Sequence, residues 1–559
     1  MEHIYREHYK RNVISLNGDW LFAIDPKKVG RDEKWFENFP ADHRHLNVPG
    51  CWNTQALDLF GYIGVAWYKK EFVCNACTLK LEFGAVLNDS EVYLDGQLLG
   101  SHYGGWSAFS FTADVEAGTH TVVVRTDSAP NRSNTIPMQD ADWYHYGGII
   151  RSVEISEFHH AYIDSHRISY ELNDDLTAAD VTVAFAVKGA SGEIPVEVKI
   201  DDDTVFNAAA KIVDGKVEIK GIHLDNIKLW GVGEPNLYTV HILLPEDDLV
   251  EKIGFREIKV QDMKFFLNRK EIFFKGVNRH EEHADWGFAV PANINRRDIE
   301  IIKNLNCNMV RGSHYPQSQT WVDYLDREGI LFWSEIPMWG ALYNDVTTVD
   351  PVLIKRGLDM HREMVEQYYH HPSIIVWGMH NEIKTELPEV YEMTRQFTEL
   401  VRGMDSSRLI TYACNRYPAD ICLDLVDFIS LNYYMGWYAG TLNDWKGFIE
   451  GARKIAEEKG VGDKPIVMSE FGCAALYGYS NFSGDKWTMQ YQCDMIKTII
   501  DLSVATDGFC GTLVWQYADI KSAKEINRAR HFNNKGLVDE FRRPKMSYYM
   551  VKDLFKNIP

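Results

Sequence analysis

The sequence predicts two consecutive β domains followed by a (β/α)8 TIM barrel, in a chain of 559 residues. Up to about residue 258, short runs of alternating hydrophobic and polar residues are separated by turn signals, a pattern typical of antiparallel sheets. Beyond about residue 262, eight apolar, β-rich runs follow one another, and the gaps between them are long enough for helices. Eight strand–helix units over about 300 residues is the count of a TIM barrel.

The first β domain is expected over residues 1–157. Alternating runs such as YKKEFV (68–73) lie between turn signals that include Asp95-Gly96. The segment EVYLDGQLLG (91–100), which contains that turn, is predicted to form a hairpin.

The second β domain is expected over residues 158–260. The alternation continues there in EIPVEVKI (193–200) and TVHILLP (239–245). A region of about 100 residues with this rhythm is typical of an immunoglobulin-like sandwich.

The barrel is expected over residues 261–559. Helical periodicity in RRDIEIIKNL (296–305) and PEVYEMTRQFTELVRGM (388–404) supports helices between the strands. The eight predicted strands are FFKGVNRH (273–280), NMVRGSHY (308–315), ILFWSEIP (330–337), IIVWGMHNE (374–382), LITYACN (409–415), FISLNYY (428–434), PIVMSEFG (465–472) and GTLVWQYAD (511–519).

Each of these runs begins apolar and ends in a polar residue that can do chemistry. Core packing would place Val, Ile and Leu at such positions, whereas TIM-barrel active sites lie at the carboxyl ends of the strands. The pattern therefore predicts an enzyme with its site at that face. The residues in question are His280, His314, Glu335, Glu382, Asn415, Tyr434, Glu470 and Asp519.

Composition narrows the class of protein further. The formal net charge of −21 argues against a partner that is nucleic acid or an anionic membrane, because either needs a positive surface. No apolar run is long enough to span a bilayer, and the polar start MEHIYREHYKRN does not resemble a signal peptide. With nine dispersed cysteines, of which Cys74 and Cys77 are expected to be structural, a cytoplasmic location is predicted.

Two strand ends carry glutamates in a context that suits glycoside hydrolysis, Glu382 on the fourth strand and Glu470 on the seventh. That reaction needs one carboxylic acid to protonate the leaving oxygen and one carboxylate to attack the sugar or to activate water. In retaining enzymes the two groups are about 5–5.5 Å apart. A negative charge on Glu470 would help to keep Glu382 protonated.

At these residues the sequence resembles family 2 of the glycoside hydrolases over essentially its whole length, and within that family the β-glucuronidases. LNGDWLFAIDP and VPGCWN resemble the family's N-terminal jelly-roll sugar-binding domain, and PNLY (235–238) its middle sandwich. GVNRHEEH, VRGSHYP, WGMHNE and MSEFG resemble its catalytic barrel. The resemblance implies that Glu382 is the acid/base, that Glu470 is the nucleophile and that Asn381 holds the sugar 2-hydroxyl.

The segment HFNNKGLVD (531–539) predicts the sugar. β-Glucuronidases resemble one another here through an Asn-x-Lys element that holds the C6 carboxylate, which places that role on Asn533 and Lys535. A lysine supplies a positive charge that a neutral hexose would not use. Of the nearby arginines, Arg530 is expected to approach the carboxylate, although Arg528 lies close in the sequence.

Further substrate contacts follow from the same resemblance. LNYYMGWY (431–438) and VWQYAD (514–519) match segments that contact the sugar, and DWYHYGG (142–148) resembles a loop that reaches from the first domain into the barrel. Two strand-end histidines are expected in the same pocket. These further contacts are Asp142, His280, His314, Asn432, Tyr434, Tyr438 and Trp515. The resemblance also implies a homo-oligomer, a tetramer.

The segment MWGALYNDVTTVDP (338–351) is short where some bacterial β-glucuronidases carry a long insertion over the mouth of the site. A more open pocket is therefore expected, one that accepts large aglycones or oligosaccharide ends. No cofactor and no catalytic metal are expected, because HEEH (280–283) lacks the histidine spacing of the H-E-x-x-H zinc motif.

Three other functions compete with this prediction. A β-galacturonidase would use the same carboxylate contact, and only the orientation of the 4-hydroxyl separates it. A β-galactosidase would have no use for Lys535 and would usually want magnesium. A non-catalytic carbohydrate-binding protein with a degenerate barrel is disfavoured because both glutamates are present.

Overall fold

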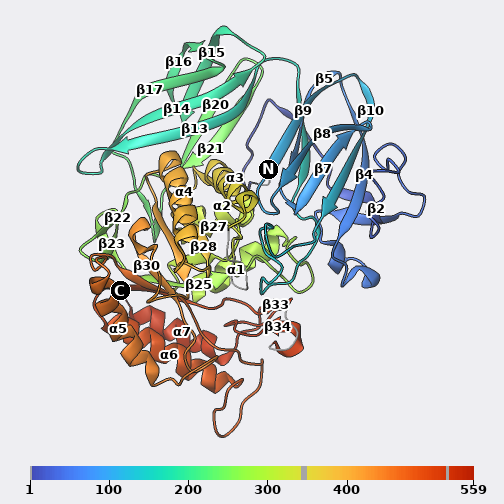
Figure 1. Ribbon diagram of the computed structural model, residues 1–559. Helices are drawn as coiled ribbons and strands as arrows, with labels where there is room; N and C mark the ends of the chain where they lie inside the picture. The colour runs from blue at the N-terminus through green and yellow to red at the C-terminus, as the bar shows by residue number, and fades with distance from the viewer. Residues whose placement is uncertain (1–2, 341–348, 524–527, 559) are drawn as a thin grey trace.

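The computed structural model describes residues 3–340, 349–523 and 528–558. Two β domains lie side by side above a barrel that contains most of the helices (Figure 1). The fold class predicted from the sequence is confirmed: a jelly-roll-like sandwich, an immunoglobulin-like sandwich and a TIM barrel follow in that order.

The N-terminal domain is a sandwich of two antiparallel sheets, ordered β1-β12-β5-β9 and β3-β2-β4-β10-β7-β8. Alternating inward residues such as Trp20, Phe22 and Tyr68 fill the space between the sheets. The predicted hairpin is present, and Asp95 and Gly96 have the positive φ angles that its tight turn requires. The strands are β1 Asn12–Ser15, β2 Gly18–Ile24, β3 Arg44–Val48, β4 Val65–Cys74, β5 Cys77–Phe83, β7 Asp89–Leu94, β8 Gln97–Tyr103, β9 Phe109–Val115, β10 Gly118–Asp127 and β12 Val153–Phe158.

The middle domain packs a three-stranded sheet, β13-β14-β17, on a four-stranded sheet, β16-β15-β20-β21. Its core is built mostly from β-branched residues, among them Val181, Val198 and Ile242. The strands are β13 Tyr162–Leu172, β14 Ala178–Lys188, β15 Gly192–Ile200, β16 Asp203–Ile212, β17 Lys216–Asp225, β20 Tyr238–Leu243 and β21 Asp248–Ile253.

The barrel closes from eight parallel strands, β25 to β32, and each strand contains residues from one of the eight predicted runs. A small sheet, β22 Ile258–Gln261, β23 Lys264–Leu267 and β24 Lys270–Ile272, precedes the barrel, and its Phe265 stacks on Phe274 of the first strand. The barrel strands are β25 Phe274–Arg279, β26 Met309–Gly312, β27 Leu331–Glu335, β28 Ile374–Asn381, β29 Leu409–Cys414, β30 Ile429–Asn432, β31 Ile466–Phe471 and β32 Phe509–Val514.

The helices follow the expected alternation except after the fifth strand. Between β29 and β30 the described chain forms only a short 3-10 turn, Leu423–Leu425. That connection contains Pro418, which removes a backbone donor and disfavours helix at the residue before it. The helices are α1 Ala292–Asn304, α2 Gln319–Glu328, α3 Pro351–Tyr368, α4 Pro388–Met404, α5 Asp444–Glu458, α6 Met489–Ala505 and α7 Met546–Asn557. None of the helices in the described ranges is long and apolar enough to cross a membrane.

Candidate active site

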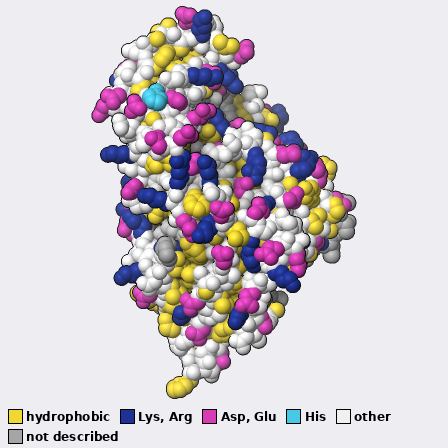
Figure 2. Space-filling model, turned by 90° about the vertical axis from the view of Figure 1, so that its left-hand side faces the viewer, with side chains coloured by type: hydrophobic (Ala, Val, Ile, Leu, Met, Phe, Trp, Pro, Cys, Tyr) yellow, Lys and Arg dark blue, Asp and Glu magenta, His cyan; other side chains and the backbone are white. Residues whose placement is uncertain are grey.

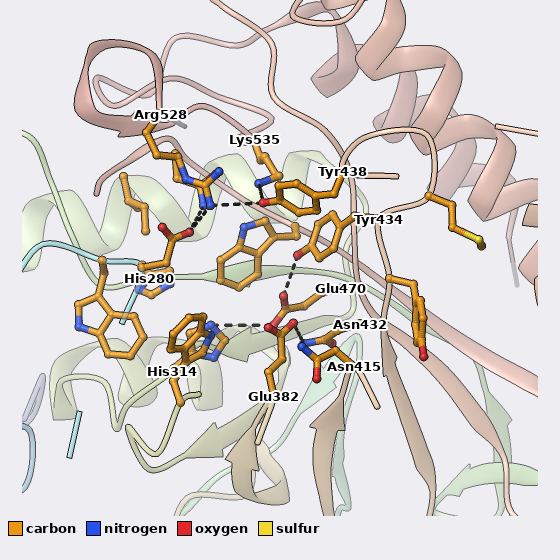
Figure 3. Close-up of a pocket in the computed structure, with 18 of the residues that line it drawn as sticks. His280, His314, Glu382, Asn415, Asn432, Tyr434, Tyr438, Glu470, Arg528 and Lys535 are labelled. Carbon is orange, nitrogen blue, oxygen red and sulfur yellow. Dashed lines mark hydrogen bonds and ion pairs between the residues drawn. The ribbon is translucent and has the colours of Figure 1, made fainter. Parts of the chain in front are cut away.

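A cavity of about 620 Å³ lies at the carboxyl ends of the barrel strands, where the sequence predicts the site (Figure 3). Eleven of the thirteen predicted site residues line it: Asp142, His280, His314, Glu382, Asn432, Tyr434, Tyr438, Glu470, Trp515, Asn533 and Lys535. The loop that carries Asp142 reaches from the N-terminal domain to the barrel, as expected. Its Trp143 pairs with Ser522 of the barrel through a β-bridge.

Glu382 follows β28, and the pairing of that strand with β29 is irregular just before it. The residue has a φ of 51°, in the left-handed region that non-glycine residues rarely occupy. Its backbone N–H donates to the carbonyl of Ala413 on β29 at 2.9 Å. Strained backbone held by neighbouring strands is a feature of functional sites, and here it fixes the direction of the carboxyl group.

Glu470, at the end of β31, is held by two donors. Arg311 donates to its Oε1 at 2.7 Å and the hydroxyl of Tyr434 donates to its Oε2 at 2.7 Å. Arg311 is fully buried and also forms a two-point ion pair with Glu335 at 2.8 and 2.9 Å. Two donors on a single carboxylate, one of them a charged guanidinium, fix its orientation.

The environment of Glu382 has the opposite effect. Burial, followed by the negative charge of Glu470, raises the pKa of Glu382 to about 8. The amide of Asn432 donates to Glu382 Oε1 at 3.0 Å and works against that shift. One carboxyl group of the pair is therefore protonated near neutral pH, while the other has the contacts of an anion, which is the division of roles that acid catalysis requires.

Asn381 lies beneath the cavity rather than on its lining. Its side-chain oxygen accepts from Arg311 at 2.7 Å and from Asn432 at 3.1 Å. Its Nδ2 group is buried and has no hydrogen-bond partner among the described residues. A buried donor without a partner beside the two carboxylates is available to an incoming hydroxyl group.

The two strand-end histidines are both buried at the site. Burial lowers the pKa of His314 to about 3 and the pKa of His280 well below its usual range, so both rings are neutral. His314 stacks on Trp515 with ring centres 5.1 Å apart, and its Nδ1 lies 2.7 Å from Glu335. Neutral rings in this position can exchange hydrogen bonds with sugar hydroxyls without adding charge.

A cationic group lies across the cavity from Glu382, and it contains Lys535 and Arg528 (Figure 3). Lys535 is 1% exposed, and its ammonium group donates to the hydroxyl of Tyr438 at 2.7 Å. Arg528 donates to Asp142 at 2.5 Å, and Asn533 donates to the same carboxylate oxygen at 3.1 Å. Although burial works in the other direction, the charges of Lys535 and Arg528 lower the pKa of the Tyr438 hydroxyl.

This grouping of cations contrasts with the outer surface. On the face drawn in Figure 2, acidic and basic side chains are interspersed. The formal net charge of the whole chain is −21, so an anionic ligand depends on cations placed locally. The cavity supplies them.

Arg530, which was expected to approach the substrate carboxylate, does not line the cavity in this structure. It adopts a φ of 62° within a short 3-10 turn, and its guanidinium pairs with Glu540 at 2.7 Å and donates to Asn534 at 2.7 Å. Arg528, two residues earlier, lines the cavity and pairs with Asp142. Sequence spacing could not distinguish them, because the contacts of Arg530 with Glu540 and Asn534 form only in the folded chain.

Two of the polar strand ends are also not part of the lining. Glu335 is fully buried and forms the ion pair with Arg311 that sits behind Glu470. Asp519 pairs with the buried Lys545 at 2.7 Å. Both residues support the site from behind instead of facing the cavity.

The sequence did not single out several lining residues. Trp143 adjoins the predicted Asp142, and Asn415 was noted only as a polar strand end. The others had no signal beyond their proximity to predicted residues. They are Trp339, Tyr433, Met435, Ala439 and Ile520.

The expectation of an open mouth concerns residues 338–351, of which 341–348 lie outside the described residues.

The two glutamates of HEEH (280–283), the segment that could be mistaken for a metal site, contact other side chains of the protein. Glu281 pairs with Arg151 at 3.1 Å, and Glu282 accepts from Tyr146 at 3.0 Å. Within the described ranges, four groups of His, Cys, Asp or Glu lie close enough together to hold an ion, and none of them includes a residue of the cavity lining.

A TIM barrel with two β domains before it and a pair of glutamates at its fourth and seventh strand ends defines a glycoside hydrolase. Family models match nearly the whole chain: the sugar-binding domain of glycosyl hydrolases family 2 at residues 13–159, a second family 2 domain at 161–256 and the family's TIM barrel domain at 258–559. The chain belongs to glycosyl hydrolases family 2.

Relatives and solved structures agree with this family. A β-glucuronidase of Paenibacillus borealis is 26% identical, over 97% of this chain and 96% of that protein. The structure of a β-galacturonidase from Eisenbergiella tayi bound to galacturonate is 28% identical, covers 100% of both chains and has a TM-score of 0.89. A β-glucuronidase from Ruminococcus gnavus in complex with a glucarolactam is 27% identical, covers 99% of both chains and also has a TM-score of 0.89.

Proposed function

We propose that this chain is a retaining, exo-acting β-glucuronidase, which hydrolyses β-D-glucuronides to glucuronic acid and an aglycone. One observation carries the substrate class. Lys535 is buried at the cavity and makes no ion pair with any described residue. A buried ammonium group without a counter-ion is costly, and a substrate carboxylate would supply the missing charge.

Arg528 and Asn533 have a different part in the same proposal. Both donate to the carboxylate of Asp142, and the Ser522 hydroxyl donates to its other oxygen at 3.1 Å. These contacts orient Asp142 as an acceptor for a sugar hydroxyl. Arg528 therefore already pairs with a carboxylate, whereas Lys535 pairs with no carboxylate of the described chain.

In the first step of the proposed mechanism, Glu470 attacks the anomeric carbon. The bond from that carbon to the aglycone oxygen breaks, and the oxygen takes the proton of Glu382. A covalent ester between the sugar and Glu470 results. Arg311 and Tyr434 hold the nucleophile in place, and the Nδ2 group of Asn381 is the donor for the 2-hydroxyl.

In the second step the roles of the pair reverse. Once Glu470 is esterified, its negative charge no longer raises the pKa of Glu382, which ionises and accepts a proton from water. The water oxygen attacks the anomeric carbon, the ester bond breaks and Glu470 is released as a carboxylate. Two inversions at one carbon give net retention.

A β-galacturonidase is the second candidate, because a clamp built around Lys535 is equally suited to that carboxylate, and the Eisenbergiella tayi protein of this kind is 28% identical. A β-galactosidase is disfavoured by the buried charge of Lys535. A carbohydrate-binding protein without activity is disfavoured by the raised pKa of Glu382 beside Glu470.

The test is hydrolysis of matched aryl β-D-glucuronide, β-D-galacturonide and β-D-galactoside substrates by the wild-type protein. We expect the glucuronide to have the highest kcat/KM, with the galactoside at least about 100-fold lower, because it leaves the buried ammonium unpaired. The highest rate on the galacturonide would establish the second candidate instead. The highest rate on the galactoside would contradict the carboxylate clamp.

Four finer statements belong to the same proposal. The domain boundaries are taken at 157 and 260. Catalysis requires no metal ion. The chain acts in the cytoplasm, which agrees with nine free cysteines. It assembles as a homotetramer, which size-exclusion chromatography with light scattering would test.

A further inference from the structure

We propose that the part of the cavity beside Glu382 binds a second sugar ring, and that Asn415 selects this sugar aglycone. The inference rests on the proposed function, because the place of the leaving group follows from the assignment of Glu382 as the acid. It adds the chemical class of the aglycone and a residue that discriminates among aglycones.

The strand order fixes where the aglycone lies. The acid donates its proton to the leaving oxygen, so the aglycone lies on the side of Glu382. Glu382 follows β28, and its backbone N–H bonds to Ala413 of the neighbouring strand β29. Asn415 comes two residues after Ala413 and lines the cavity. Lys535, at the other end of the substrate, lies beyond β32, which stands across the closed barrel from β28.

Figure 3 places these residues accordingly. Asn415 lies next to Asn432 and close to Glu382, at the opposite end of the drawn cavity from Lys535 and Arg528. A uronic acid that reaches from Lys535 to the two glutamates leaves the lining near Asn415 uncovered. That part of the cavity is available to whatever is bonded to the anomeric carbon.

The side chain of Asn415 is uncommitted. Its Oδ1 atom is buried at the cavity and has no hydrogen-bond partner among the described residues. The neighbouring Asn432 has the same side chain but is fully engaged: it donates to Glu382 at 3.0 Å and accepts from Ser469 at 2.7 Å. A buried amide oxygen without a donor is expected to be satisfied by a ligand, and a sugar hydroxyl is a donor of the right kind.

The surroundings of Asn415 suit a pyranose more than a flat aromatic group. Met435 and Ala439 add apolar lining on the side of β30. Trp339 lines the cavity on the other side of Glu382, after β27, with its ring centre 6.3 Å from that of Trp143. A pyranose combines apolar C–H faces with hydroxyl groups at its edge. The apolar side chains would pack against the faces of the sugar ring, and the amide of Asn415 would accept a hydrogen bond from a hydroxyl group at its edge.

The test compares two substrates in wild type and Asn415→Ala: a small aryl β-glucuronide and a disaccharide with β-linked glucuronate at its non-reducing end. Loss of one neutral hydrogen bond predicts that the ratio of kcat/KM for the disaccharide to kcat/KM for the aryl glucuronide falls about 3- to 10-fold. Asn207→Ala, at an exposed asparagine of the middle domain, is the matched control and should leave the ratio unchanged.

The outcomes separate this inference from the proposed function. If wild type cleaves neither glucuronide, the proposed function fails and the inference fails with it. If wild type cleaves the aryl glucuronide but Asn415→Ala leaves the ratio of the two substrates unchanged, only the sugar subsite is overturned. A fall in the ratio in Asn415→Ala and not in Asn207→Ala supports the subsite. Thermal unfolding of both variants checks that each is folded.

Discussion

Replacing Lys535 with methionine tests the carboxylate clamp, because methionine keeps most of the length of the side chain and removes its charge. In the wild type the ammonium group is buried, donates to the Tyr438 hydroxyl at 2.7 Å, and lies 4.9 and 5.3 Å from the ring centres of Tyr438 and Tyr434. These oxygen and ring contacts stabilise a cation only in part. A glucuronate carboxylate would therefore provide much of its stabilisation.

The size of the effect follows from the cost of leaving one buried charge unpaired. A hydrogen bond to a charged group contributes about 1.5–3 kcal/mol, and removal of one partner from a buried ion pair costs about 3–5 kcal/mol. Arg528 remains nearby, but its charge is shared with Asp142. We expect an intermediate loss of about 2–4 kcal/mol, which is a fall of roughly 30- to 1,000-fold in kcat/KM for the glucuronide.

The assay measures kcat/KM on matched aryl β-D-glucuronide and β-D-glucoside, which differ only at C6. Lys535→Met should lower the ratio of glucuronide to glucoside by the factor given above. Lys497→Met, at an exposed lysine of α6 that pairs with Asp501, is the control and should not change the ratio. An unchanged ratio in Lys535→Met would refute the reasoning, because the carboxylate would then be recognised elsewhere.

Three further predictions concern protonation, the support of the nucleophile and the contact between domains. Because Glu382 must be protonated to act as the acid and its pKa is about 8, kcat/KM should fall tenfold per pH unit above about pH 8; a profile that stays flat to pH 9.5 would contradict this. Arg311→Met should leave Glu470 and Glu335 as unpaired buried anions, lowering stability by about 3–5 kcal/mol and kcat by more than about 100-fold; a fully stable, active variant would count against the role of Arg311. Arg256 of the middle domain donates to three barrel carbonyls, those of Pro372, Ser407 and Ile374. Arg256→Met should therefore lower Tm, while KM for the aryl glucuronide stays the same. Equal Tm values for the variant and the wild type would show that these hydrogen bonds do not contribute to stability.

The sequence predicted the barrel well because its strands carry their own signal. A strand buried on both faces must be apolar along its length, so eight such runs could be recognised without knowing the fold. All eight became barrel strands. The described segment between β29 and β30, which contains Pro418, forms only a 3-10 turn, and the count of strands could not predict the conformation of that connection.

The sequence predicted those site residues whose location follows from their position at a strand end. The two glutamates and the histidines are fixed by strand ends, and the structure brings them together at one cavity. Side-chain direction is set by tertiary contacts, which explains why Arg530 turns away to Glu540. Glu335 was indistinguishable from a lining residue in the sequence because its partner, Arg311, is on a different strand.

Asn415 illustrates the same limit in the other direction. As a polar strand end it looked no different from Asp519, which is engaged with Lys545. Only the absence of a partner for its amide oxygen in the described structure distinguishes it. Whether a buried polar group is satisfied depends on residues far away in the sequence, and a pattern cannot show that.

The central claim is that Glu470 attacks a glucuronide to form an ester while Glu382 supplies the proton. The most direct measurement is mass spectrometry of the protein after reaction with a 2-deoxy-2-fluoro-β-glucuronide that carries a good leaving group, since the fluorine slows hydrolysis of the ester and lets it accumulate. The account predicts one added fluoroglucuronosyl group, carried by the peptide that contains Glu470 and lost in Glu470→Gln. A label on another residue, or release of an α-configured product from a β-glucuronide without any label, would contradict it.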